Sequence, residues 1–87
     1  MAEKITWDKT AEGQFQEILK QIPELIRGIA EIRVRKKAES LAAGNNSLID
    51  EKVMVDAFFA ETPPGFVPPM KKSMEMLGID YIKYGYK

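Results

Sequence analysis

The sequence predicts an all-α domain, a small orthogonal bundle of three main helices with a short fourth helix and an irregular C-terminal tail. Apolar residues recur at steps of three and four over residues 11–58, the spacing of one helix face. Proline, glycine and asparagine clusters interrupt this pattern where each helix is expected to end. The β-branched stretch around Val53 and Val55 follows a helix-capping signal, which favours a helix over a strand there.

The first helix is expected to run from about residue 8 to residue 21. Thr6 or Asp8 is the predicted N-cap, because a side-chain oxygen there can accept from an unpaired backbone N–H. Pro23 cannot continue the hydrogen-bond ladder and disfavours helical geometry in the residue before it, so we expect a sharp corner at 21–23. The apolar face consists of Ala11, Phe15, Ile18, Leu19 and Ile22.

The second helix, over residues 22–43, is expected to organise the domain. Pro23 suits a first helical turn, and Glu24 favours the positive end of the helix dipole. Gly28 lies inside the helix at a cost of about 1 kcal/mol relative to alanine, which predicts close approach by another helix or by Trp7. One face, expected to be covered by other segments, carries Leu25, Ile26, Ile29, Ala30, Val34, Ala38, Leu41 and Ala42. The opposite face carries Arg27, Arg33, Arg35, Lys36 and Lys37.

The third helix should follow a stop at residues 44–46, Gly-Asn-Asn, which tolerate the left-handed conformation. Asp50 is its predicted N-cap, and Ile49 and Met54 are spaced as a hydrophobic staple. The helix should end at residues 62–65, Thr-Pro-Pro-Gly.

An extended connector over residues 66–69 should lead to a fourth helix over residues 70–77. Pro69 can open that helix, and Gly78 with Ile79 predicts a Schellman ending. The tail, residues 80–87, is expected to pack loosely; it contains Tyr81, Tyr84 and Tyr86.

Composition excludes several kinds of chemistry. The chain has 87 residues, enough for a single domain spanning 1–87, with 13 basic and 13 acidic residues. It contains no cysteine and no histidine, which argues against disulfides, thiolate chemistry, zinc fingers and imidazole catalysis. No signal-peptide pattern or membrane-length apolar run is seen, so we expect a cytoplasmic protein. We predict no catalytic residue, no metal site and no cofactor.

The basic helix face is the candidate binding site, formed by Arg27, Arg33, Arg35, Lys36 and Lys37. It could contact an acidic partner or phosphates. It could also be a solvated face, partly neutralised by Glu31 and Glu39. We expect an ion pair between Arg33 and Asp56 of the third helix.

Other features have structural and functional interpretations. Met70, Met74 and Met76 could bind a soft metal but are better explained by core packing. Asp50 and Glu51 suit a helix start better than acid–base catalysis. The tail tyrosines could stack on a planar ligand or pack on the surface. Of the neighbours Phe58 and Phe59, one should fill the core, while the other lies under the proline-rich connector or is exposed.

A set of residues in fixed order resembles the PCP_red domain, the small helical domain at the C-terminal end of one of the subunits of light-independent protochlorophyllide reductase. The similarity covers residues 5–60, and the tryptophan-to-Ile-Pro spacing is its most specific part. The matching positions are Trp7, Ala11, Leu19, Ile22, Pro23, Ile26, Arg27, Ala30, Arg33, Lys37, Glu39, Ala42, Gly44, Ile49, Asp50, Val53 and Ala57.

The resemblance implies a shared accessory module rather than the reductase activity, since the large catalytic region and every cysteine ligand are missing. Residues 61–87, the proline-rich connector, short helix and tyrosine-rich tail, lie outside the pattern. If the role of the module transfers, it is carried by Trp7, Ile22, Pro23, Arg27 and Arg33. The leading hypothesis is a non-enzymatic interaction module that contacts a protein partner or a tetrapyrrole-like ligand. The alternative is weak nucleic-acid binding by the second helix; no oligomeric state is indicated.

Overall fold

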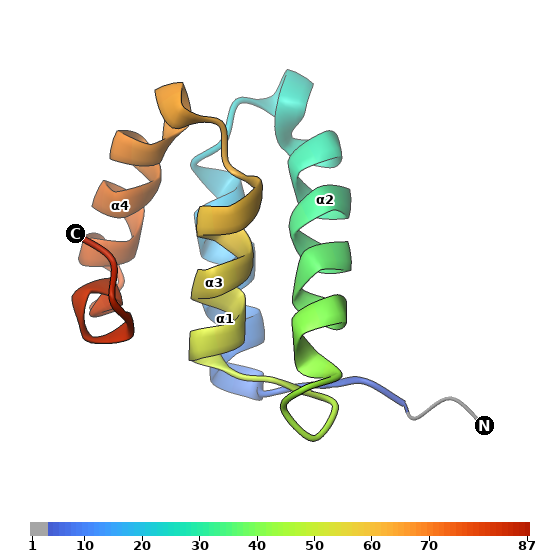
Figure 1. Ribbon diagram of the computed structural model, residues 1–87. Coiled ribbons are helices and arrows are strands. Elements are labelled where there is room, and N and C mark those ends of the chain that lie inside the picture. The colour runs from blue at the N-terminus through green and yellow to red at the C-terminus, as the bar shows by residue number, and fades with distance from the viewer. Residues whose placement is uncertain (1–3) are drawn as a thin grey trace.

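The computed structural model describes residues 4–87 and shows a bundle of four helices within that range (Figure 1). The helices alternate in direction along the chain, so sequential neighbours run up and down in turn. The predicted all-α bundle is confirmed, but its helices pack in an antiparallel and not an orthogonal arrangement. Its helices are α1 (Lys9–Lys20), α2 (Glu24–Ala42), α3 (Glu51–Glu61) and α4 (Val67–Met76).

The start of α1 and the corner that follows it agree with the prediction. The Asp8 carboxylate accepts a hydrogen bond from the backbone N–H of Ala11 at 3.1 Å, which makes Asp8 the N-cap. The N–H groups of Gln21 and Ile22 then close the last turn on the carbonyls of Ile18 and Leu19, each at 3.0 Å. The chain therefore turns before Pro23 and enters α2 directly.

Two short strands, β1 (Thr6–Trp7) and β2 (Leu48–Ile49), form a parallel pair that the sequence did not predict. The backbone N–H of Asp8 donates to the carbonyl of Ile49 at 2.9 Å. Each strand has only two residues, too few to produce the alternating pattern by which strands are recognised. The pairing fixes the start of α1 beside the start of α3.

Helices α1 and α3 occupy the middle of the molecule, with α2 on one side and α4 with the tail on the other (Figure 1). The rings of Phe15 and Phe58 meet between α1 and α3, with centroids 5.6 Å apart. The largest fully buried side chains are Phe15, Phe58, Ile18, Ile49, Met54, Met74 and Val55.

Helix α2 is too long to be covered by the helices beside it. Its 19 residues extend about 28 Å, whereas the 11 residues of α3 extend about 16 Å. Only Val34, Ala38 and Ala42, all in its C-terminal half, are buried. The expectation that the whole apolar face is covered was wrong, because Leu25 is 95% exposed and Ile29 is 59% exposed.

The end of α2 and the start of α3 lie where they were predicted. The helix stops at Ala42, but the left-handed residues that follow are Asn46 and Ser47, with φ of 55° and 59°, and not Gly44. Asp50 caps α3 by accepting from the N–H of Val53 at 2.9 Å.

Helix α4 begins earlier than predicted. The expected extended connector over residues 66–69 does not form: Phe66 ends a 3₁₀ turn, η1 (Pro64–Phe66), and α4 starts at Val67 rather than near Met70. Prolines 68 and 69 fit the first turn because their missing N–H groups would have no helical partner. The predicted Schellman ending is confirmed: Gly78 has φ of 76°, and the N–H of Ile79 donates to the Met74 carbonyl at 2.9 Å.

The tail forms a second 3₁₀ turn, η2 (Tyr81–Tyr84), and is not loosely packed as expected. The hydroxyl of Tyr84 donates to Glu51 at 2.5 Å, and that of Tyr86 donates to Asp56 at 2.6 Å. The ring of Tyr86 stacks on Phe59 with centroids 3.9 Å apart. Phe59 is therefore covered by the tail, and not by the proline-rich connector.

These contacts shift the ionisation of the groups involved. Burial and the hydrogen bond to Asp56 raise the pKa of Tyr86 to about 12. Burial and the hydrogen bond to Glu51 likewise raise the pKa of Tyr84 well above its usual range. Burial alone would raise the pKa of Glu51, but the hydrogen bonds from Tyr84 and Gln14 and the charge of Lys83 outweigh it and lower that pKa.

The raised tyrosine pKa values predict a loss of stability at high pH. Unfolded tyrosines release their protons near pH 10. The folded chain holds those of Tyr84 and Tyr86 longer, so the free energy of unfolding should fall as the pH rises from about 10. The slope is at most about 1.4 kcal/mol per pH unit for each tyrosine. Urea denaturation over this range measures it. The double variant Y84F/Y86F should flatten the slope; an equally steep slope would contradict the role of the tail.

Candidate functional site

An apolar groove of about 490 Å³ opens at the end of the molecule where α2 begins. Its floor is made by core residues of α1, α3 and α4, including Ile18, Phe58 and Met70. One wall is the first half of α2 and the other is the connector between α3 and α4. The wall residues are Ile22, Pro23, Ile26, Ile29, Ala30, Val34, Pro63, Phe66 and Pro69.

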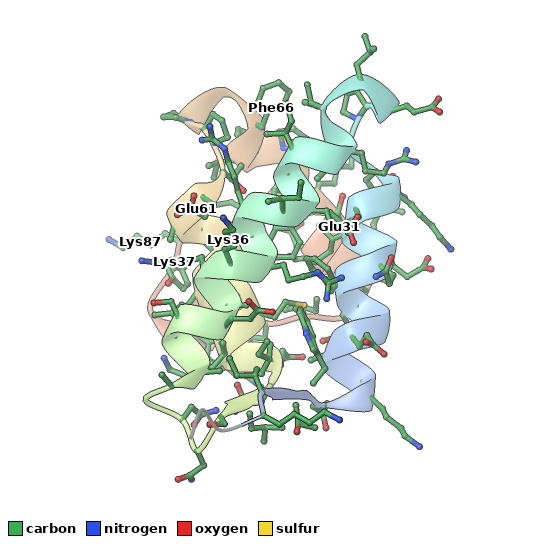
Figure 2. The ribbon with its side chains drawn as sticks, turned by 90° about the vertical axis from the view of Figure 1, so that its right-hand side faces the viewer. Glu31, Lys36, Lys37, Glu61, Phe66 and Lys87 are labelled. Atoms are coloured by element: carbon green, nitrogen blue, oxygen red, sulfur yellow. The ribbon has the colours of Figure 1, made fainter. Side chains whose placement is uncertain are left out.

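The groove is a consequence of the lengths of the elements. Because α3 ends beside the middle of α2, the chain turns away at residues 62–66 before it can cover the first half of α2. Phe66 reaches the rim of the groove near the start of α2 and stays 46% exposed (Figure 2). The prolines of the connector fix the opposite wall with little backbone freedom.

Three cations lie beside the groove. Arg33 lines both the groove and a shallower depression next to it, which is also lined by Lys36, Lys37, Ser40 and Glu61. Within residues 4–87 no ion pair joins Arg33, Lys36 or Lys37 to an acid. We call these three residues the cationic rim. Their charge is available to a partner.

Arg27 belongs to the predicted basic surface but closes the corner between α1 and α2 instead. Its guanidinium donates to the carbonyl of Ile22 from Nη2 at 3.0 Å and to the carbonyl of Lys20 at 3.3 Å. Lys20 is the last residue of α1 and Ile22 lies just beyond it, so no N–H of α1 remains to bond these two carbonyls. Arg27 is thus a structural residue.

Arg35 lies on the same side of α2 as α1. It pairs with Glu31 at 3.1 Å, and its guanidinium lies 5.5 Å from the Trp7 ring centroid and 5.2 Å from that of Phe15. Figure 2 shows Glu31 on the side of α1, and Lys36 and Lys37 on the side of Glu61. The prediction that all five cations form one surface was therefore wrong, since the structure brings together only Arg33, Lys36 and Lys37.

The expected ion pair between Arg33 and Asp56 was also wrong. Asp56 pairs with Lys52 at 2.8 Å, one turn away on α3, and accepts from the hydroxyl of Tyr86. Asp56 therefore contacts Lys52 of its own helix and Tyr86 of the tail, and not Arg33 of α2 as predicted.

An exposed apolar stripe runs along the outer face of α2. Leu25 is 95% exposed, and Ile29 and Ile32 are each 59% exposed. Gly28 lies among them, and a Cβ atom added there would meet nothing within 4 Å. The predicted approach of another helix or of Trp7 to Gly28 was therefore wrong. We call Leu25, Ile29 and Ile32 the apolar stripe.

The remaining candidates are structural. Met70 and Met74 are buried, which confirms core packing for both, but Met76 is 74% exposed. Asp50 is a helix cap, and Glu51 accepts hydrogen bonds from Tyr84 and Gln14. Residues 4–87 hold no group of three His, Cys, Asp or Glu side chains placed to bind a metal. No helix in this range combines the length and apolar character needed to cross a membrane.

Comparison with known proteins gives no relative: no family model, no curated protein and no solved structure matches this chain. The resemblance to the PCP_red domain stays a prediction. Five residues were expected to carry the role of that module. Two of them, Trp7 and Arg27, make contacts within the fold, and the other three, Ile22, Pro23 and Arg33, line the groove.

The two arginines should respond differently to truncation. Arg27→Ala leaves two helix-end carbonyls without their charged donor and should lower the free energy of unfolding by about 1–2 kcal/mol. Arg33→Ala breaks no hydrogen bond and should stay within about 0.5 kcal/mol of the wild type. Urea denaturation of both variants measures this difference, and equal losses would contradict the assignment of roles.

Proposed function

We propose that the protein is a non-enzymatic interaction module and that its partner protein binds the face of α2 that carries the groove, the apolar stripe and the cationic rim. The observation that supports this most strongly is the exposure of three aliphatic side chains in the first half of the longest helix. Fully burying one such side chain contributes about 2 kcal/mol. Contiguous exposed apolar surface of this kind is typical of protein interaction sites.

The geometry favours a protein partner over nucleic acid. Arg27 and Arg35 are engaged within the fold, which leaves three cations on this face. The Glu61 side chain lies among them, and the net charge of the chain is zero. Binding to a nucleic-acid backbone requires many cations without acidic neighbours, whereas this surface is mainly aliphatic. The resemblance to an accessory domain of a larger enzyme is consistent with a docking role.

Site-specific photocrosslinking in the native cell tests the proposal. A benzoylphenylalanine at position 25 or 32 should crosslink to the same discrete partner, because both side chains project from the binding face. The same probe at position 76 is the matched control, since Met76 is a comparably exposed apolar residue on α4. An identical set of crosslinked proteins from positions 25, 32 and 76 would contradict the proposal.

A tetrapyrrole-like ligand is a second candidate, supported by the groove itself. The groove has apolar walls and a volume of about 490 Å³, and Arg33 at its edge could pair with a carboxylate. Trp7 does not line the groove, so its fluorescence would be an indirect probe.

Titration with protoporphyrin IX, followed by the absorption of the porphyrin, tests this candidate. Binding should shift the spectrum, and Ile29→Glu should weaken it at least about tenfold by placing a charge at the groove wall. Ile82→Glu, at an exposed apolar position of the tail, is the control. A porphyrin spectrum that stays unchanged at high protein concentration would contradict tetrapyrrole binding.

A further inference from the structure

We infer that the partner presents an acidic amphipathic helix, which lies along the apolar stripe of α2 with its carboxylates against the cationic rim. This inference depends on the proposed function and specifies its partner.

The spacing of the stripe matches a helix–helix seam. Leu25, Ile29, Ile32 and then Lys36 follow one another at steps of four, three and four residues. Their mean step of about 3.7 residues is close to the 3.6 residues of one helical turn, so the side chains stay in line along one face and a second helix can pack against them. From Leu25 to Lys36 the seam extends about 16 Å, or three helical turns.

Gly28 supports a close approach on this face. A glycine inside a helix costs about 1 kcal/mol relative to alanine. No other part of the described chain uses the space that its missing side chain leaves, because outside the neighbouring residues and backbone of its own helix no atom lies within 4 Å of the absent Cβ. The position lies between Leu25 and Ile32 on the exposed side of α2, where it would allow the backbone of a docked helix to come near.

The charges on α2 set the character of the docked helix. Lys36 continues the apolar stripe, and Arg33 and Lys37 lie beside it without an ion pair in the described chain. At the other end of the stripe, Glu24 is exposed in the first turn of α2. Glu61 is one negative charge among the three positive charges of the rim. Carboxylates on the partner are therefore still attracted to the rim and repelled from the start of α2, which sets the register of docking.

Two synthetic peptides test the inference. Each is a stapled helix of about 14 residues with one leucine and isoleucine stripe, since shorter free helices are unstable in water. One carries glutamates beside the last turn of the stripe, and the other carries lysines there. Fluorescence anisotropy with the full chain should show at least about tenfold tighter binding of the glutamate peptide, falling with added salt.

Charge reversal supplies the matched variants. The triple variant R33E/K36E/K37E should bind the lysine peptide in preference to the glutamate peptide. A control triple variant, K4E/K9E/K72E, changes three exposed cations outside this face and should keep the wild-type preference. Far-ultraviolet circular dichroism checks that both variants keep the helical fold.

Each other outcome overturns the inference. Equal binding of the two peptides would show that charge does not select the partner. Crosslinks from positions 25 and 32 without binding of either peptide would exclude a helical acidic segment and leave the proposed function standing. If there are neither crosslinks from positions 25 and 32 nor binding of either peptide, the proposed function and this inference are both wrong. A dimer in sedimentation that Ile29→Glu dissociates would make a second copy of the chain the occupant of the stripe.

Discussion

The packing of α3 against the C-terminal half of α2 is the contact on which the rest of the structure depends. Ala38 and Ala42 have no side chain beyond Cβ and are fully buried, so the two helices can lie close together. Asp50 fixes the start of α3 near the end of α2, and the antiparallel direction follows from the short loop between them. Since α3 is eight residues shorter than α2, the first half of α2 extends past it.

This difference in length accounts for the groove. The stripe has another cause: at about 100° per residue, Leu25, Ile29 and Ile32 lie on the opposite side of α2 from the buried Val34, Ala38 and Ala42. The connector after α3 crosses the end of the core and forms a second wall opposite Ile26 and Ala30. Arg27 holds the start of α2 on the end of α1 through backbone carbonyls, so the exposed half of the helix is anchored at both ends. The cations of α2 thereby divide into those that maintain the fold and those that face the solvent beside the groove.

Local signals predicted most of the fold. Caps such as Asp8 and Asp50, the corner before Pro23 and the Schellman ending at Gly78 depend on neighbouring residues, so the sequence contains the whole signal. Features that depend on distant segments were missed. The strand pair places Trp7 beside Ile49, and the hydroxyl of Tyr86 reaches back from the tail to Asp56 on α3. No local pattern around any of these four residues indicates its partner.

The cations of the candidate site were predicted from the sequence, but its exposed apolar residues were not. Arg33, Lys36 and Lys37 were identified from their helix face, but the apolar residues of that helix were expected to be covered. The helical period could have corrected this, because Leu25 and Ile29 fall on the opposite side of α2 from Ala38 and Ala42 at about 100° per residue, so one core cannot cover them all. The roles of Arg27 and Arg35 depend on carbonyls and rings of α1 and β1, which periodicity does not reveal.

Both proposals depend on the uncovered aliphatic side chains in the first half of α2. The most direct measurement is the relaxation of leucine and isoleucine methyl protons by a soluble paramagnetic agent in an NMR experiment. The methyl signals of Leu25, Ile29 and Ile32 should broaden strongly, whereas those of the buried residues Ile18 and Ile49 should not. Protection of the three α2 residues to the level of Ile18 would contradict the account.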